Sequence, residues 1–303
     1  MICEHPKYRL ALKAKGVNLY ECNHCHLIYI KDKPVEKVEE IYKNYYKKNT
    51  GGRFNFGIEH IVKMFRFTRA YSVYLENKKA TSVLDIGSGR GWMLYFLKHY
   101  FGYTRTAGTQ ISENAYLFSK DKLGLEIYKK DLLGMSFESP FQTVTMLHVL
   151  EHVENPEAYI RKIHEILEDK GLIIIEVPNY NAWSRCITKK HWLSLDIKHH
   201  LTFFTPETLT KLLEKYNFKV KKIHTYSLEY GAFTSTQSFV NLITNSNDIF
   251  YNWLQNKTQS KYIAIHILLF FILLPFCFLI NMLLYFSKKG EVLYVVAEKN
   301  KEK

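Results

Sequence analysis

Hydrophobic and polar positions between residues 82 and 226 follow two different periods, one typical of buried strands and one typical of amphipathic helices. Short apolar runs predict six strands, at residues 83–86, 104–110, 125–128, 141–152, 172–177 and 218–226, the fourth of them running into a polar loop. Helical patterns begin after Gly91, Ser112, Asn155 and Thr205, and the last two residues are each followed by a proline, which is typical of helix starts. The helix after Asn155 should end at Gly171. Strands that alternate with helices in this way predict an α/β fold with a doubly wound parallel sheet.

The flanking segments have other patterns. The first 33 residues predict a small ribbon, and residues 34–79 predict two helices, at 35–46 and 58–77, that form a lid or linker. A stretch of 25 residues, 262–286, carries no charged side chain. A further apolar run at 291–297 predicts one more strand. We therefore expect four parts: 1–33, 34–79, a Rossmann-like domain formed by 80–230 with 290–299, and an apolar helical insertion at 231–289.

The link between the first strand and its helix is rich in glycine. It reads Asp85-Ile-Gly-Ser-Gly-Arg-Gly91, and glycines let the backbone turn tightly and approach a ligand closely. Trp92 stands where a dinucleotide-binding fingerprint requires its third glycine, which weakens a nicotinamide interpretation. An ordinary turn with glycines needed for packing remains an alternative.

The acidic residue followed by Gly-x-Gly-x-Gly resembles the first motif of class I S-adenosylmethionine-dependent methyltransferases. The resemblance implies a seven-stranded sheet, with Gly87, Gly89 and Gly91 behind the methionine part of S-adenosylmethionine and Asp85 near its amino-acid end. It also implies that Gln110 meets the ribose hydroxyls, although the family usually has an acidic residue there, and some cyclopropane-fatty-acid synthases look similar at this point. Asp131 resembles the residue that meets the adenine amino group.

Histidines follow two of the predicted strands. His148, Glu151 and His152 come at the end of the fourth strand, and His199 and His200 follow the fifth. Ligands of open α/β sheets bind beyond the carboxyl ends of the strands, so both groups should meet at one edge. A histidine there can remove a proton from an acceptor hydroxyl near neutral pH. We expect His152 or His199 to do so, with His148 and Glu151 as neighbouring candidates, although each histidine taken alone is more often structural.

Cysteines near the N-terminus form half of a metal-ribbon pattern. Cys22 and Cys25 have the C-x-x-C spacing of a zinc knuckle, and Cys3 stands where the opposite knuckle belongs. A structural Zn²⁺ then needs a histidine as its fourth ligand, most simply His5, with His24 or His26 as alternatives. A ribbon held by packing alone, with reduced cysteines, is the competing interpretation.

The resemblance now extends over residues 3–226, to methyltransferases that carry an N-terminal zinc-ribbon-like segment. Relatives of this shape include sugar C-methyltransferases and enzymes of polysaccharide biosynthesis, and polyprenyl-quinone O-methyltransferases share the Leu-Glu-His element seen at 150–152. These motifs specify the cofactor much better than they specify the acceptor.

Composition bears on the partner. Hydrophobic residues make up 47% and charged residues 23% of the 303 positions, as in ordinary globular proteins, but 42 Lys and Arg against 29 Asp and Glu give a net charge of +13. Nucleic acid, an anionic membrane or a phosphorylated substrate would suit that charge, as would lysines scattered over the surface. The uncharged stretch at 262–286 favours a membrane, since an RNA-modifying enzyme does not need one.

That stretch is long enough to cross a bilayer as one helix. The family resemblance implies, however, that the strand at 291–297 is inserted antiparallel beside the sixth strand, so both ends of the stretch belong on one side of a membrane. We expect Pro275 to divide it into two short helices that form a re-entrant or interfacial hairpin. Burial against the catalytic domain or at a dimer interface is the alternative.

The family resemblance, together with the uncharged stretch, implies an S-adenosylmethionine-dependent methyltransferase acting on a sugar, a glycolipid or another lipid-linked acceptor, by O-methylation. We expect it to be cytoplasmic and peripheral or monotopic at the inner face of the membrane. An RNA-modifying methyltransferase and a catalytically inactive membrane adaptor are the alternatives, and the oligomeric state stays open.

Overall fold

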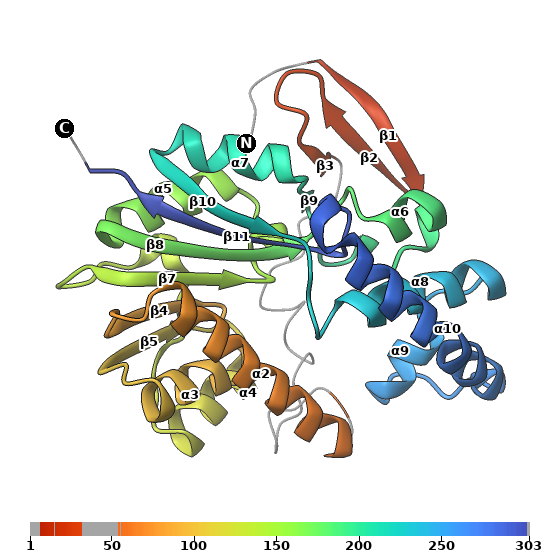
Figure 1. Cartoon of the computed structure of the whole chain (residues 1–303), viewed down its shortest axis with the longest axis horizontal. Coiled ribbons are helices and arrows are strands. Elements are labelled where there is room, and N and C mark those ends of the chain that lie inside the picture. Colours follow the sequence, from red (N-terminus) through yellow and green to blue (C-terminus); the bar gives the residue numbers. More distant parts are fainter. Residues whose placement is uncertain (1–6, 15, 32–53, 55, 302–303) are drawn as a thin grey trace.

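The computed structural model describes residues 7–14, 16–31, 54 and 56–301. Its centre is a seven-stranded sheet with the order β10-β11-β8-β7-β4-β5-β6 (Figure 1). Strands β8, β7, β4, β5 and β6 run parallel, and β11 is antiparallel to both β8 and β10. The strands are β4 (Ser82–Ile86), β5 (Arg105–Thr109), β6 (Glu126–Tyr128), β7 (Phe141–Leu147), β8 (Leu167–Pro178), β10 (Phe218–His224) and β11 (Val292–Lys299). The predicted Rossmann-like α/β sheet is therefore confirmed, including the last strand inserted antiparallel beside the sixth.

Helices cover both faces of this sheet. One face packs against α5 (Pro156–Ile166) and α7 (Pro206–Lys215), and the other against α2 (Phe56–Glu76) and α3 (Trp92–Tyr100). The remaining short helices and turns are α4 (Glu113–Leu117), a π turn (Phe118–Lys122), α6 (Trp183–Thr188) and 3₁₀ turns at Leu132–Gly134, Leu150–His152, Lys189–His191 and Leu193–Leu195.

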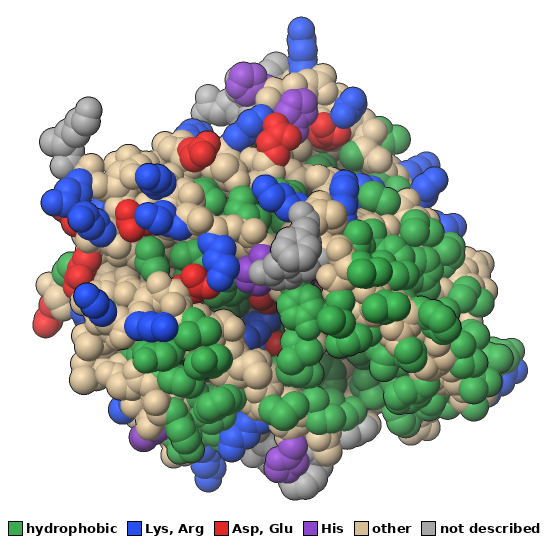
Figure 2. Space-filling view, viewed as in Figure 1, with side chains coloured by type: hydrophobic (Ala, Val, Ile, Leu, Met, Phe, Trp, Pro, Cys, Tyr) green, Lys and Arg blue, Asp and Glu red, His purple; other side chains and the backbone are tan. Residues whose placement is uncertain are grey.

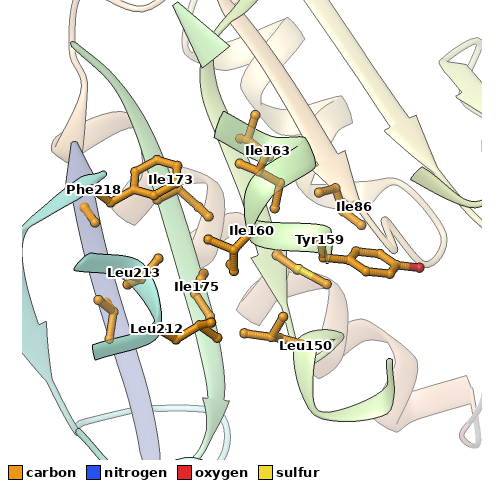
Figure 3. Close-up of a cluster of buried hydrophobic side chains, with 14 of the residues drawn as sticks. Ile86, Leu150, Tyr159, Ile160, Ile163, Ile173, Ile175, Leu212, Leu213 and Phe218 are labelled. Atoms are coloured by element: carbon orange, nitrogen blue, oxygen red, sulfur yellow. The ribbon is translucent and has the colours of Figure 1, made fainter. Parts of the chain in front are cut away.

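Alternate residues of the central strands separate two cores. Ile173 and Ile175 of β8 belong to the core under α5 and α7, where they meet Ile160 and Leu213 (Figure 3), and Ile174 belongs to the core under α2 and α3. All are fully buried, and burying a side chain of this size contributes about 1.5–3 kcal/mol. Strands this apolar on both faces are typical of a sheet that helices cover twice.

The predicted helix starts are confirmed, but one predicted helix end is wrong. Asn155 Oδ1 accepts from Ala158 N at 3.1 Å, and Thr205 caps α7 in the same way. Helix α5 ends at Ile166, earlier than the expected stop at Gly171, because β8 already begins at Leu167. The pairing of β7 with β8 changes register there, so the chain bulges at 168–171 before the strand continues.

The N-terminal segment forms a second, smaller sheet. Strands β1 (Tyr8–Ala14), β2 (Val17–Cys22) and β3 (Ile28–Ile30) form an antiparallel meander, and β3 also pairs with β9 (Thr202–Phe203). The sequence pattern did not predict β9, which is only two residues long. The helix expected at 35–46 lies outside the described residues.

The insertion before β11 is helical, as expected. It contains α8 (Gly231–Thr244), α9 (Ile249–Leu254), α10 (Ile263–Leu283) and a 3₁₀ turn (Leu284–Ser287). The predicted break at Pro275 is wrong, because α10 runs through it as one helix. Proline removes one helical hydrogen bond, but α10 is buried on both sides of it, at Phe270 before and at Cys277 and Asn281 after. Asn281 Nδ2 also donates to Ser235 Oγ of α8 at 2.8 Å, which holds the second half of α10 against α8.

Candidate active site at the carboxyl edge of the sheet

The glycine loop lies at the carboxyl edge of β4 and has a backbone that other residues adopt poorly. Gly87, Gly89 and Gly91 have φ of 70°, 56° and 72°, in the left-handed region. A Cβ on Gly87 would lie 2.4 Å from a methyl group of Val149, in the loop that follows β7. The loop is therefore closely packed against the segment that carries His148 and His152.

Asp85 is the buried acidic residue that precedes this loop. Its Oδ1 accepts a hydrogen bond from Thr145 Oγ1 at 2.7 Å. Burial raises the pKa of Asp85 to about 7, although the Thr145 hydrogen bond and the positive charges of Arg69 and Arg66 act in the opposite direction. Asp85 can therefore change its charge near neutral pH.

A buried ion-pair network joins α2 to the end of β8. Arg69 donates to Glu176 and lies 3.0 Å from Glu229, which also pairs with Arg66 at 2.8 Å. Burial disfavours the charged form of Glu176, but Arg69 and His148 outweigh it and hold its pKa at about 2. The sequence analysis missed this network. The i, i+3 spacing of the two arginines, in the helix just before the cofactor strand, was the available signal.

The two polar residues assigned to the nucleoside already make contacts within the protein. Gln110 Oε1 accepts from Ser112 N at 2.8 Å, so its amide nitrogen is the group it can offer a ribose hydroxyl. Asp131 caps the turn at 132–134 by accepting from Leu133 N at 2.8 Å, and it also accepts from Tyr159. Their nucleoside contacts stay predictions.

The histidine groups expected from the sequence do meet at this edge. His148 Nε2 lies 2.8 Å from Glu176 and its Nδ1 lies 3.4 Å from Glu151. Burial disfavours protonation of His148, but the two carboxylates outweigh it and raise its pKa. The rings of His152 and His200 lie 4.8 Å apart, so the segments after β7 and β8 converge as predicted.

The two favoured bases differ in their surroundings. Burial lowers the pKa of His152 to about 4, so it is neutral at physiological pH and a weak proton acceptor. His199 instead has its Nδ1 2.8 Å from the carboxylate of Asp196, a residue that the sequence analysis did not select. Burial disfavours the charged form of Asp196, yet His199 and His200 hold the pKa of Asp196 well below its usual range. Such a carboxylate orients an imidazole.

One cluster of the described residues has the composition of a metal site. It consists of Glu151, His152 and His200, whose ligand atoms lie within 4.8 Å of one another. The ribbon site expected from the sequence is different. Cys22 is buried and Cys25 is half-buried, and His24 N donates to Cys22 Sγ at 3.4 Å. Cys3 and His5 lie outside the described residues, so zinc in the ribbon stays a prediction.

Comparisons with known proteins bear on the family of the chain. Residues 59–223 match the family model of the methyltransferase domain. The ubiquinone biosynthesis O-methyltransferase of Rickettsia typhi is 22% identical over 207 residues, which cover 64% of this chain and 82% of that protein. Its counterpart in Dinoroseobacter shibae is 28% identical over 149 residues, 45% of this chain and 59% of that protein. The (S)-coclaurine N-methyltransferase of Papaver somniferum is 26% identical over 113 residues, 34% of this chain and 32% of that protein.

Solved structures share the fold. A SAM-dependent methyltransferase from Archaeoglobus fulgidus aligns with a TM-score of 0.51 and 21% identity, over 78% of this chain and 94% of its own. A complex of a methyltransferase with the Trm112 methyltransferase activator from Haloferax volcanii aligns with a TM-score of 0.53 and 13% identity. The alignment covers 84% of this chain and 100% of that chain. The match to the family model spans more than half of the 303 residues and contains the glycine loop and the edge described above. The chain therefore belongs to the methyltransferase domain family, as a class I S-adenosylmethionine-dependent methyltransferase.

Proposed function

We propose that this enzyme methylates an oxygen atom of a lipid-linked acceptor at a membrane surface. The observation that carries the proposal is an exposed apolar helix, α10, in an insertion that contacts the active edge of a methyltransferase. The ubiquinone biosynthesis O-methyltransferases among the relatives support the reaction type. A glycolipid fits the same surface, and the cytoplasmic face of the membrane fits the basic chain.

The residues at the edge suit the cofactor. We assign Gly87, Gly89 and Gly91 to its methionine part, Asp85 to its ammonium group, and Gln110 with Asp131 to its nucleoside. The left-handed glycines leave the backbone open for close approach of a ligand, and a buried carboxylate is a fitting partner for an ammonium ion. When bound, S-adenosylmethionine supplies an electrophilic methyl group on a sulfonium.

Cofactor affinity should rise with pH through the titration of Asp85. Its carboxyl is mostly protonated below about pH 7 and cannot then pair with the ammonium group, whereas above that value the carboxylate is ready to do so. We expect the Kd for S-adenosylmethionine at pH 6 to be about eightfold higher than at pH 7.5. Calorimetry at both pH values measures this. Asp85→Asn should bind weakly at both, and the same pH dependence in that variant would contradict the assignment.

The outer face of α10 is apolar along its length. Leu268, Ile272, Leu279 and Leu283 are each more than half exposed, and Figure 2 shows apolar side chains gathered over this part of the molecule. Helix α10 is long and apolar enough to cross a membrane, and only 17% of its most apolar window is buried in the protein. An apolar face this large favours contact with a partner or a lipid surface.

Contact of α10 with a membrane surface along its length fits the topology better than a helix that crosses the membrane. Helix α10 packs on α8, which itself packs on the domain through Asn241 and Ser238. Strands β10 and β11 pair with each other on the two sides of the insertion. The helix therefore lies against α8 and exposes the opposite face, as an interfacial helix does. Lys257, Lys261, Lys288 and Lys289 flank it and suit an anionic leaflet.

The same insertion reaches the active edge. Glu229 and Tyr230 immediately precede α8, where Glu229 pairs with Arg66 and Arg69 and the Tyr230 ring lies 4.3 Å from the His148 ring. At the other end, Asn179 after β8 donates to Gly290 O at 2.7 Å. The insertion that carries the apolar face is thus held to the active edge at both of its ends.

We assign His199 as the base that removes the acceptor proton, since Asp196 orients its ring. Burial disfavours the protonated form of His152, which makes His152 the weaker base. Loss of a general base typically costs 10²–10⁴ in rate, so His199→Ala should lower kcat by about 10² or more. Asp196→Asn should lower kcat less and alter its pH profile. Steady-state kinetics with cofactor affinity measured in parallel tests this. Turnover near wild type in folded His199→Ala would remove the residue from the reaction.

The substrate class is testable directly. Purified enzyme is given S-adenosylmethionine labelled in its methyl group, together with membranes from the source organism, its soluble sugars or its RNA. We expect label in the solvent-extractable lipid fraction, in a form that methyl-ether analysis assigns to oxygen. Label in soluble sugars or in RNA with none in lipid would overturn the proposal.

A further inference from the structure

Helix α2 has an outward face that is apolar although it is exposed. Ile61, Met64, Phe67, Tyr71 and Leu75 recur every three or four residues, and each is 38–57% exposed. Among the described residues of α2, none of the exposed ones is Asp, Glu, Lys or Arg. This α2 stripe therefore runs for about 20 Å along the helix without a charge, as in helices that lie on a membrane or on a partner.

The opposite face of α2 holds the helix firmly on the domain. Ala70 and Val73 are fully buried in the core under α2 and α3. Phe67, at the border of the α2 stripe, has its ring 5.2 Å from the ring of Phe96 in α3. Glu59, near the start of α2, forms an ion pair with Arg90 of the glycine loop. The α2 stripe is therefore fixed in position relative to the cofactor loop.

The active edge lies between the α2 stripe and the insertion that carries α10. On one side, Arg69 of α2 donates to Glu176 at the end of β8. On the other side, the ring of Tyr230, just before α8, lies 4.3 Å from the ring of His148. Figure 2 shows apolar side chains gathered over α2 and α3 and again over the insertion, with charged side chains between them. The two apolar surfaces therefore face the same way and flank the active edge.

Lysines lie close to the α2 stripe, as they do at α10. Lys78 and Lys79 follow the end of α2, and both are exposed. Lys98, also exposed, comes two residues before Tyr100 of α3, whose ring lies 5.9 Å from the ring of Phe67. Lysines beside an apolar surface are attracted to anionic lipid head groups, and tyrosines favour the boundary between head groups and acyl chains. The surroundings of the α2 stripe therefore suit an anionic lipid surface.

We propose that the α2 stripe is a second membrane-contact surface, so that α2 and α10 lie together on one anionic lipid surface with the active edge between them. This assignment rests on the proposed function and gives the lipid-linked acceptor a path between the two helices. A lipid surface can meet two separate apolar faces at once. A second copy of the chain that covered both faces would also cover the active edge and exclude the acceptor.

Vesicle binding of matched variants tests the α2 stripe. Full-length protein carrying Met64→Glu with Tyr71→Glu is co-sedimented with vesicles of phosphatidylcholine and phosphatidylglycerol that contain no acceptor. We expect partitioning to fall at least about tenfold relative to wild type. Leu10→Glu with Leu133→Glu alters two exposed leucines elsewhere, adds the same charge and should bind vesicles like wild type. Tm and S-adenosylmethionine affinity should stay unchanged in both variants, because all four side chains are exposed.

A fluorescent label reports the contact directly. A polarity-sensitive fluorophore is attached to Met64→Cys, and wild type treated in the same way gives the background from native cysteines. Its fluorescence should rise and shift to shorter wavelength when the vesicles are added, as should that of a label at Ile272→Cys in α10. A label at Leu10→Cys in β1 should not respond.

Three results would overturn the second contact. One is wild-type vesicle binding by the α2 variant. Another is a Met64→Cys label that responds to protein concentration without vesicles, which would mean that a second copy covers the stripe. The third is a lower Tm in the α2 variant with vesicle binding retained, which would mean that another part of the chain covers it.

Failure of the second contact is distinguishable from failure of the proposed function. If lipid is methylated while the α2 variant binds vesicles like wild type, the contact through α2 fails and the proposed function stands. If vesicles bind through α2 as expected but lipid is not methylated, the contact stands and the acceptor assignment fails.

Discussion

Gly89→Leu should abolish S-adenosylmethionine binding, with an affinity loss of at least 100-fold by calorimetry. Gly89 has φ of 56° in the middle of the glycine loop, where we place the methionine part of the cofactor. A side chain there would occupy the space that the ligand needs, and it would also strain the backbone by about 1–2 kcal/mol. Blocking the space prevents binding even if the loop keeps its shape.

A matched change separates these two effects. Gly102 also has positive φ, 76°, and an added Cβ there would meet no atom within 4 Å. Gly102→Leu should therefore lower Tm by an amount comparable to that in Gly89→Leu, while S-adenosylmethionine binds normally. Unchanged cofactor affinity in folded Gly89→Leu would remove the loop from the cofactor site.

Three glutamates on the outer face of α10 should release the enzyme from membranes. Leu268→Glu, Ile272→Glu and Leu279→Glu replace side chains that are 51–58% exposed and lie on the side of α10 opposite Phe270 and Cys277. Each apolar side chain contributes about 1.5–3 kcal/mol when it is fully buried, so even partial insertion of three implies at least a 100-fold loss of vesicle partitioning. Co-sedimentation with vesicles containing anionic lipid measures the loss. Turnover of a lipid-linked acceptor in vesicles should fall with it, while cofactor affinity stays unchanged.

The control places the same charge elsewhere. Leu10→Glu, Leu117→Glu and Leu133→Glu alter exposed leucines of β1, of α4 and of the turn at 132–134. This triple variant has the same net charge as the α10 variant and should still bind vesicles. Equal loss in both would indicate that charge alone governs the association. Full solubility of the wild type, with no vesicle binding, would indicate that α10 covers another protein surface instead.

Local patterns were sufficient to predict most of the sheet. The apolar strands, the glycine loop and the proline-marked helix starts each depend on neighbouring residues, and the structure has them at the expected places. The meeting of His152 with His200 followed from one general property of parallel sheets, because both residues come after strands that end at the same edge.

Contacts between distant segments could not be predicted from local sequence patterns. Arg69 meets Glu229 across 160 positions, and Glu291 receives hydrogen bonds from Ser184 and Trp192. Such contacts depend on how the whole chain folds, and the local pattern of hydrophobic and polar residues contains no information about them. The error at Pro275 has the same origin, since the packing of α10 against α8 on both sides of the proline outweighs a local breaking signal.

The backbone of Leu201 links the N-terminal sheet to the active edge. Ile30 N of β3 donates to Leu201 O at 3.0 Å, and Leu201 N donates to Glu151 O at 2.8 Å. A shortened enzyme that starts at α2 would keep the glycine loop and Asp85 but would lose the strand that steadies Leu201 and, next to it, His200. Truncation should therefore uncouple two abilities that the whole chain combines: the shortened protein would still retain its methyl donor but would no longer align an acceptor for it.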